Sequence, residues 1–196
     1  MNRRYSNIFL VLVTVIGLLG CQQAHEDKEL KDYYTLNPSK DFVLTNQDGQ
    51  VFHLSQLRGK TVFLFFGFLS CPDICPTALS KLTRVYKQLP EINDHFITVF
   101  VSVDPAKDTP AKLKEYLSFF KIKSIGLTGA KEEIDKVVDA YGAVYQIVPQ
   151  FGGDYTIDHS AYIYLIDKLG KVRQLFHPED GADKIIKAVK ELEKEQ

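Results

Sequence analysis

Tryptophan is absent from this 196-residue sequence, and sulfur is scarce, with three cysteines and one methionine. Basic patches are lacking too: the formal net charge is −1, and lysine and arginine are scattered along the chain. Because nucleic-acid binding usually needs a basic patch or stripe, this distribution argues against a nucleic-acid partner. The sequence contains neither internal repeats nor low-complexity tracts. Its length suits one domain with a substantial core.

The apolar run near the N-terminus, residues 8–19, is too short to cross a bilayer comfortably. It is uncharged, follows Arg3 and Arg4, and has the length of a signal-peptide hydrophobic region. The run ends in "LLGC", a pattern similar to a bacterial lipobox. We therefore expect cleavage before Cys21, lipidation of its sulfur, and a membrane-anchored, exported bacterial lipoprotein whose domain faces the periplasm or the cell exterior. The alternative is an ordinary signal peptide or membrane anchor.

These features predict three regions: a lipoprotein signal peptide over 1–20, a tether over 21–40, and a folded domain over 41–196. Residues 22–40 are mostly polar and lack a steady apolar period, as a tether would. If Cys21 carries lipid, Cys71 and Cys75 are the remaining thiols. Export would place both in a compartment where disulfides form readily.

The domain is predicted to alternate strands and helices. Apolar and polar residues alternate on both sides of Asp48-Gly49, which predicts a hairpin over 41–54. Continuous apolar runs over 61–68 and 95–103 predict buried strands. Helical spacing of apolar residues, with capping signals, predicts the remaining elements. These are helices over 77–89, 108–120, 130–142 and 181–195, a short strand over 124–129, and strands over 160–167 and 171–176.

Strands that alternate with helices early in the chain require parallel pairing, and the last two strands, joined by a tight turn, form an antiparallel hairpin. This order is the layout of an α/β protein with a thioredoxin-like fold. In that layout Cys71 and Cys75 lie between the first central strand and its helix, where α/β proteins tend to place their chemistry. The partial positive charge of a helix N-terminus lowers thiol pKa, so we expect acidic cysteines.

The stretch "FLSCPDICPTAL", residues 68–79, allows three interpretations of its two cysteines. A structural disulfide across so short a loop would constrain the unfolded chain little. A redox pair in this fold usually has two intervening residues, often preceded by tryptophan; here there are three, and Ser70 precedes Cys71. A peroxiredoxin is poorly supported, because Leu64 and Phe68 occupy the positions of its proline and threonine. The third interpretation is a metal site.

A metal site needs a further ligand, and His159 in "YTIDHSAYIYLID" is the best candidate. A thioredoxin-like layout places this segment beside the cysteine loop, where thioredoxins usually have a cis-proline. Two thiolates and an imidazole select copper, as Cu(I) or Cu(II), whereas zinc, the runner-up, usually needs a fourth ligand. For the other histidines we expect solvated or hydrogen-bonded side chains. They are His25, His53, His95 and His177.

Four motifs, "CPDICPT", "VSVDPAKDTPAKLKEY", "GLTG" and "YTIDHSAYIYLID", resemble in order and spacing the Sco/SenC family of copper-binding proteins, over about residues 41–190. The resemblance implies a membrane-anchored thioredoxin-like domain that binds copper through Cys71, Cys75 and His159. It also implies delivery of copper to the dinuclear centre of cytochrome c oxidase subunit II or to another copper-accepting protein. "VPQFGGDY", residues 148–155, matches the family's inserted hairpin or loop before the His159 strand. In the Asp104–Pro110 stretch the acids and prolines predict a turn and a helix start.

The leading hypothesis is therefore a copper metallochaperone. The alternative is an enzyme, a thiol–disulfide oxidoreductase that reduces target cysteines without metal and whose Cys71 and Cys75 form a disulfide when oxidised. A third hypothesis is a copper store or sensor with no oxidase partner. His159 discriminates between the first two, because disulfide exchange does not need it.

Overall fold

The strand predicted over residues 61–68 is β3 (Thr61–Gly67), and it is buried over its whole length. The computed structural model describes residues 41–195. Val62, Leu64 and Phe66 belong to one hydrophobic core, and Phe63 and Phe65 belong to a second one on the opposite face of the sheet. An apolar residue at nearly every position is what a strand covered on both faces requires. The prediction of a doubly buried strand is confirmed.

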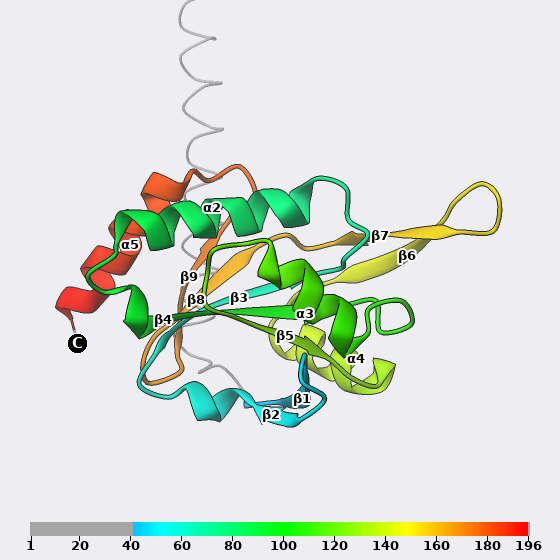
Figure 1. The fold of residues 1–196 in the computed structure, drawn as a ribbon, viewed down its shortest axis with the longest axis horizontal. Helices are drawn as coiled ribbons and strands as arrows, with labels where there is room; N and C mark the ends of the chain where they lie inside the picture. Colours follow the sequence, from blue (N-terminus) through cyan, green and yellow to red (C-terminus); the bar gives the residue numbers. More distant parts are fainter. Residues whose placement is uncertain (1–40, 196) are drawn as a thin grey trace, which may run out of the picture.

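β3 is part of a seven-stranded mixed sheet (Figure 1). β3, β4 and β5 are parallel neighbours, β8 and β9 extend the sheet antiparallel beyond β3, and the N-terminal hairpin extends it beyond β5. The order is β2-β1-β5-β4-β3-β8-β9, which is the predicted thioredoxin-like arrangement with an added N-terminal hairpin. The strands are β1 (Val43–Asn46), β2 (Val51–His53), β4 (Phe96–Ser102), β5 (Ser124–Thr128), β8 (Ile163–Ile166) and β9 (Val172–Phe176).

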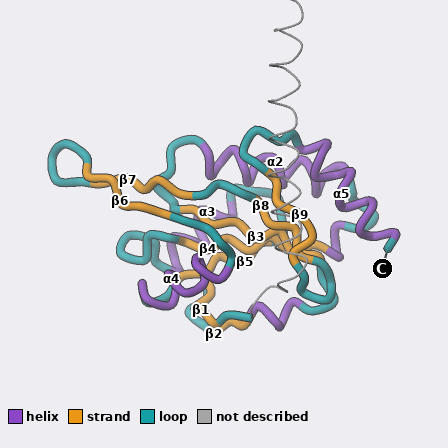
Figure 2. Tube along the Cα trace, turned by 180° about the vertical axis from the view of Figure 1, so that it is seen from behind, coloured by secondary structure: helices purple, strands orange, loops and turns teal. Residues whose placement is uncertain are grey.

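Helices cover both faces of the sheet (Figure 2). Three of them, α2 (Ile74–Gln88), α3 (Pro110–Ser118) and α5 (Ala182–Lys194), pack on the face that includes Phe63. The remaining helix of the described residues, α4 (Lys131–Ala140), packs on the other face, in a core to which the N-terminal hairpin also contributes side chains. Two short 3-10 helices lie in connecting segments: η1 (Leu54–Leu57) between β2 and β3, and η2 (Asn93–His95) between α2 and β4. Within residues 41–195, no helix is both long and apolar enough to cross a membrane.

Local signals set several element boundaries correctly. The Thr109 hydroxyl oxygen accepts a hydrogen bond from the Lys112 backbone N–H, and Pro110 is the first residue of α3, which is the helix start predicted in the Asp104–Pro110 stretch. Gly142 follows α4 with a φ of 60°, the left-handed conformation that glycine adopts readily. The prediction for α2 was less accurate, because the helix begins at Ile74 and not at residue 77. Cys75 therefore lies in its first turn.

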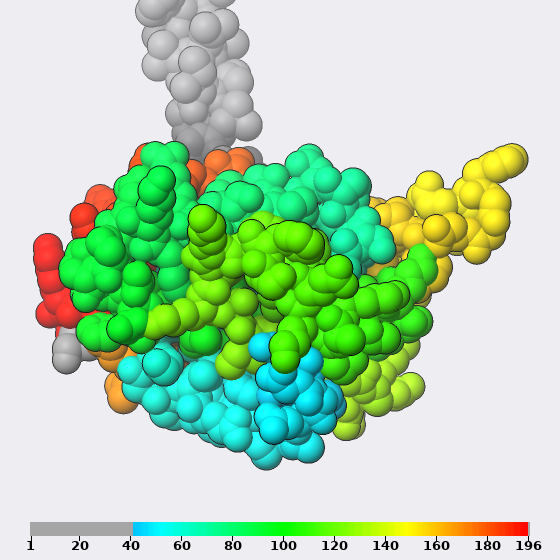
Figure 3. Space-filling model, in the orientation of Figure 1, coloured from blue at the N-terminus to red at the C-terminus, as the bar shows by residue number. Residues whose placement is uncertain are grey.

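A second, two-stranded sheet projects from the body of the molecule (Figure 3). It pairs β6 (Tyr145–Pro149) with β7 (Tyr155–His159). The predicted inserted hairpin over 148–155 therefore exists but is longer than expected. His159 was expected immediately before a strand over 160–167, but it is the last residue of β7, paired with Tyr145. β8 starts only at Ile163, because Ser160 still bonds to Val144 of the hairpin.

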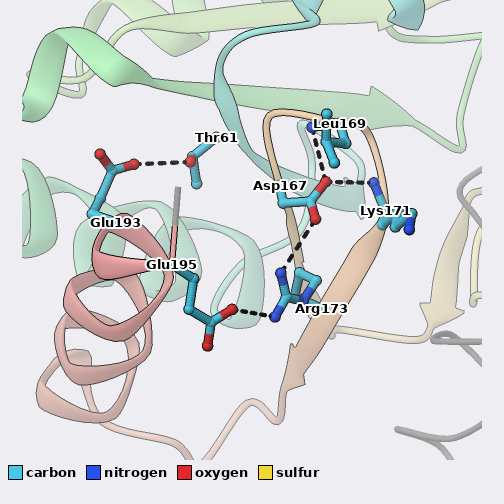
Figure 4. A network of polar contacts seen from close by, with 7 residues as sticks. All are labelled: Thr61, Asp167, Leu169, Lys171, Arg173, Glu193 and Glu195. Atoms are coloured by element: carbon cyan, nitrogen blue, oxygen red, sulfur yellow. Dashed lines mark hydrogen bonds and ion pairs between the residues drawn. The ribbon is translucent and has the colours of Figure 1, made fainter.

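The turn between β8 and β9 is fixed by Asp167, which is buried (Figure 4). One carboxylate oxygen accepts the backbone N–H groups of Leu169 and Lys171, and the other accepts a bond from Arg173. Arg173 also pairs with Glu195, just beyond the end of α5. This network ties the closing hairpin to the C-terminal helix, at a distance from the cysteines.

Candidate metal centre

Cys71 lies in the loop between β3 and α2, at the helix N-terminus. Its backbone N–H donates to the Phe68 carbonyl oxygen over 3.2 Å, which forms a tight turn. Its Sγ atom accepts a hydrogen bond from the Cys75 backbone N–H over 3.4 Å. The side chain of Asp73, the residue before α2, makes no capping bond. The Cys71 sulfur thus takes the place of a helix cap, at the positive end of the helix dipole.

Cys75 lies below the surface, with no exposed area. Space for its sulfur comes from Gly67, the last residue of β3. A Cβ atom at Gly67 would lie 2.8 Å from Cys75 Sγ, 2.9 Å from Phe65 and 3.1 Å from Phe100. A residue with any side chain at position 67 would therefore displace the thiol. Both cysteines are free.

His159 completes the group from the other side. Its Nε2 atom lies 3.5 Å from Cys75 Sγ, and its ring packs edge-on against Phe65 and Phe68, with centroid distances of 6.1 and 5.7 Å. Nδ1 lies 3.1 Å from the carbonyl oxygen of Ser160. Because a carbonyl oxygen can only accept, Nδ1 donates in this contact, and Nε2 is the ring nitrogen that faces the cysteines. A metal-binding histidine is oriented in the same way.

The two thiols differ strongly in acidity. A hydrogen bond from the Cys75 thiol, together with the backbone N–H groups of Cys75 and Asp73, outweighs burial and lowers the pKa of Cys71 to about 5. The same hydrogen bond, together with burial, raises the pKa of Cys75. At neutral pH the pair therefore shares one proton, with a thiolate on Cys71 and a thiol on Cys75. This agrees with the expected effect of a helix N-terminus on Cys71, whereas the expectation of an acidic Cys75 was wrong.

The three ligand atoms of Cys71, Cys75 and His159 lie within 4.8 Å of one another. Such a group can hold a metal ion, and its two sulfurs and one imidazole nitrogen form a soft donor set. Within residues 41–195, no other cluster of three or more histidine, cysteine or acidic side chains is arranged in this way. The sequence-based prediction that these three residues come together is borne out by the geometry.

The remaining histidines lie elsewhere. His95 pairs with Glu193 over 3.0 Å, and the His177 ring packs edge-on against Tyr162, with a centroid distance of 4.9 Å. His53 is exposed at the end of β2. His25 and the predicted lipidation site Cys21 lie outside the described residues.

Sequence reasoning missed the burial of two acidic residues beside the site. Asp104 and Asp108 were interpreted as parts of a turn and a helix start, yet they are only 4% and 2% exposed. Asp108 accepts a bond from the Leu69 backbone, and Asp104 accepts one from Tyr155 of β7. The available signal was their position: both follow the carboxyl end of β4, at the edge of the sheet where the cysteines lie.

Fold and site together define a thioredoxin-like domain with a candidate Cys2His metal centre. The SCO1/SenC family model matches residues 32–194, so the chain belongs to this family. It is 40% identical over 152 residues to an SCO2-like protein from Rickettsia felis, covering 76% of this chain and 74% of that protein.

Solved structures agree with this assignment. ScoI from Bradyrhizobium japonicum, with copper bound, is 37% identical, has a TM-score of 0.72, and covers 79% of this chain and 99% of its own. A SCO1/SenC family lipoprotein from Bacillus anthracis is 29% identical and has a TM-score of 0.68. Its match covers 80% of this chain and 96% of the lipoprotein chain. BsSco, described as a member of a family of cytochrome c oxidase assembly proteins and as having a disulfide switch, is 29% identical and has a TM-score of 0.63. Its match covers 80% of this chain and 93% of the BsSco chain.

Proposed function

We propose that this protein is a copper metallochaperone that binds one copper ion through Cys71 Sγ, Cys75 Sγ and His159 Nε2. The observation that carries the proposal is the convergence of these three atoms within 4.8 Å. Copper is favoured over zinc because two thiolates and one imidazole form a soft, low-coordinate set, whereas zinc usually takes four ligands. The copper bound to the similar ScoI protein supports the same choice.

Loading changes the protonation of the cysteine pair. The Cys71 thiolate is ready to bind a cation, and its hydrogen bond from the Cys75 backbone N–H holds it toward Cys75. Cys75 must lose its proton to become a second thiolate ligand, so one proton leaves as copper enters. The half-buried His159 supplies the third donor through Nε2, since Nδ1 is the nitrogen that donates to Ser160.

Release is expected to begin at Cys71. Cys71 is half-buried, whereas Cys75 is fully covered, so an incoming ligand reaches the copper from the Cys71 side. Three protein donors leave room for a further ligand. A thiolate of an accepting protein can therefore join before a donor of this chain leaves, and the ion never becomes free.

The proposed recipient is the dinuclear copper centre of cytochrome c oxidase subunit II or another copper-accepting protein. The similarity to BsSco, a member of a family of cytochrome c oxidase assembly proteins, supports this target. We further propose that lipid on Cys21 anchors the domain, 41–196, to the outer face of a membrane through residues 22–40. The lipobox-like "LLGC" and the similarity to the Bacillus anthracis lipoprotein support the anchor.

A thiol–disulfide oxidoreductase is the second candidate, and the low pKa of Cys71 favours it. In that reaction the Cys71 thiolate attacks one sulfur of a target disulfide, and the target's other sulfur leaves as a thiolate. Cys75 then loses its proton and attacks Cys71 Sγ. The products are a Cys71–Cys75 disulfide and a reduced target, with two electrons transferred. This reaction requires neither a metal nor the His159 ring.

Anaerobic titration of the reduced protein with Cu(I) and with Zn(II), against a competing chelator, tests the proposed function. We expect one tightly bound copper per chain, and weaker zinc binding. Cys71→Ser and Cys75→Ser should abolish tight Cu(I) binding, because a serine hydroxyl is a hard, neutral donor. His53→Ala, at an exposed histidine far from the site, is the matched control and should bind copper as the wild type does. Undiminished affinity in either serine variant would refute the site.

A further inference from the structure

Two carboxylates, those of Asp104 and Asp108, are buried in the loop between β4 and α3, although neither belongs to the Cys2His group. Acidic side chains are rarely covered so completely unless hydrogen bonds satisfy them. Each of these two has such partners, and the partners lie on the two segments that carry the candidate metal ligands. The two carboxylates therefore do more than start α3, because they also contact the cysteine loop and the hairpin that ends at His159.

Asp108 holds the cysteine loop. Its Oδ2 atom accepts the Leu69 backbone N–H over 3.0 Å, two residues before Cys71. The same atom accepts the hydroxyl of Ser102, the last residue of β4, over 2.7 Å. The loop is thereby fixed to the end of a central strand by a charge-assisted pair of bonds, which are stronger than neutral ones.

Asp104 holds the hairpin that carries His159. Its Oδ1 atom accepts the Tyr155 hydroxyl over 2.8 Å, and Tyr155 is the first residue of β7, the strand that ends at His159. Lys107, from the same loop, lies 3.6 Å from the centroid of the Tyr155 ring and pairs with Asp154 over 2.6 Å. The loop thus contacts the hairpin through several groups.

The hydrogen bond of Asp108 to the cysteine loop and that of Asp104 to the hairpin are connected to each other through further hydrogen bonds. The Asp104 backbone N–H donates to Ser102 Oγ over 3.0 Å, and the Ser102 hydroxyl donates to Asp108. The Asp108 N–H also donates to the Asp104 carbonyl oxygen over 2.9 Å. Hydrogen bonds therefore run without a break from Leu69, through residues 102–108, to Tyr155.

We propose that Asp104 and Asp108 are positioning residues that couple the His159 hairpin to the cysteine loop. Through them, residues 102–108 set the separation of His159 from Cys71 and Cys75, and a displacement of the hairpin is transmitted to the cysteine loop. The mechanical part of the proposal holds in the copper-free protein. Its consequence for copper rests on the proposed function of the three ligands.

Amide hydrogen exchange of the reduced, copper-free protein tests the coupling directly. Tyr155→Phe removes only the hydroxyl that bonds to Asp104. We expect exchange at Leu69 N–H, which lies on the far side of the network, to accelerate about tenfold, the effect of weakening a bond to a charged group. Dividing the exchange rate of the Leu69 amide by that of a central-strand amide, such as Val99, removes any effect of a change in global stability.

Tyr145→Phe is the matched control. Its hydroxyl bonds to Asp135 of α4 over 2.5 Å, so this variant loosens the same hairpin without touching residues 102–108. We expect Leu69 exchange to stay at the wild-type rate. The coupling is refuted if Tyr155→Phe leaves the normalised Leu69 exchange unchanged, or if Tyr145→Phe accelerates it equally.

The consequence for copper is tested by measuring Cu(I) affinity in the same Tyr155→Phe preparation and in an Asp108→Asn variant. We expect Cu(I) affinity to fall about tenfold in each, as for other residues that orient metal ligands. Faster Leu69 exchange together with wild-type copper affinity would overturn the positioning role. A wild-type protein that does not bind copper would refute the proposed function instead, while the exchange result would still decide the coupling.

Discussion

His159 Nε2 lies 3.5 Å from Cys75 Sγ, although the two residues are 84 positions apart in the chain. The contact forms because α2 begins at the carboxyl end of β3 and because β7 ends beside it, before the chain enters β8. The Cys75 thiol, the Cys71 thiolate and the imidazole of His159 thereby lie together at a site that is only partly covered by the protein.

Alkylation of Cys71 should follow its low pKa. Because the pKa is lowered to about 5, the thiolate persists as pH falls, and the rate of reaction with iodoacetamide should rise through about pH 5 and level off well below pH 8. Cys75→Ala removes the largest cause of the shift, so the midpoint should move upward. It should stay below the ordinary thiol value, because the Asp73 and residue-75 backbone N–H groups remain. Identical midpoints in the two proteins would contradict the assigned hydrogen bond.

Gly67→Ala should weaken copper binding as well as stability. The added Cβ would lie 2.8 Å from Cys75 Sγ and 2.9 Å from Phe65, so the thiol must move. We expect a loss of about 1–3 kcal/mol in the free energy of unfolding, as for other overpacked cores. Denaturant unfolding and chelator competition measure the two effects.

Gly126→Ala is the control for that substitution. Its Cβ would lie 2.8 Å from Leu117 and 3.0 Å from Leu113, away from the cysteines. It should destabilise the fold by a similar amount while Cu(I) affinity stays at the wild-type value. Equal losses of affinity in the two variants would show that the effect of Gly67→Ala is not local to Cys75.

Cys21 should carry lipid in the mature protein. Mass spectrometry of the detergent-extracted protein should show an acylated N-terminal Cys21, and residues 1–20 should be absent. Cys21→Ser should leave the membrane fraction, because the serine oxygen does not receive the lipid that the cysteine sulfur does. An unmodified Cys21→Ser protein that stays in the membrane fraction would contradict the anchor.

The sequence was informative where short-range chemistry decides. The buried strand β3, the Thr109-Pro110 helix start and the proximity of Cys71, Cys75 and His159 were all predicted correctly. The start of α2 was placed after Pro76, although proline is tolerated in the first turn of a helix, where its missing N–H has no partner to lose.

Features that depend on tertiary contacts could not be predicted from the sequence in the same way. The apolar residues after Ser160 predict a continuous strand, but Ser160 pairs with Val144 in the separate hairpin, so β8 begins later. Asp104 and Asp108 look like ordinary surface caps in the sequence. Their burial depends on Tyr155 and Leu69, which are distant in the chain.

The most direct test of the account is one measurement pair on a single His159→Ala preparation: Cu(I) affinity under anaerobic chelator competition, and the rate of thiol–disulfide exchange. Loss of one of three ligands should lower copper affinity by about 100-fold or more, beyond the effect of residues that only orient ligands. Disulfide exchange depends on thiolate attack and access, so its rate should change modestly. Wild-type copper affinity together with lost disulfide exchange would contradict the copper chaperone and establish the oxidoreductase in its place.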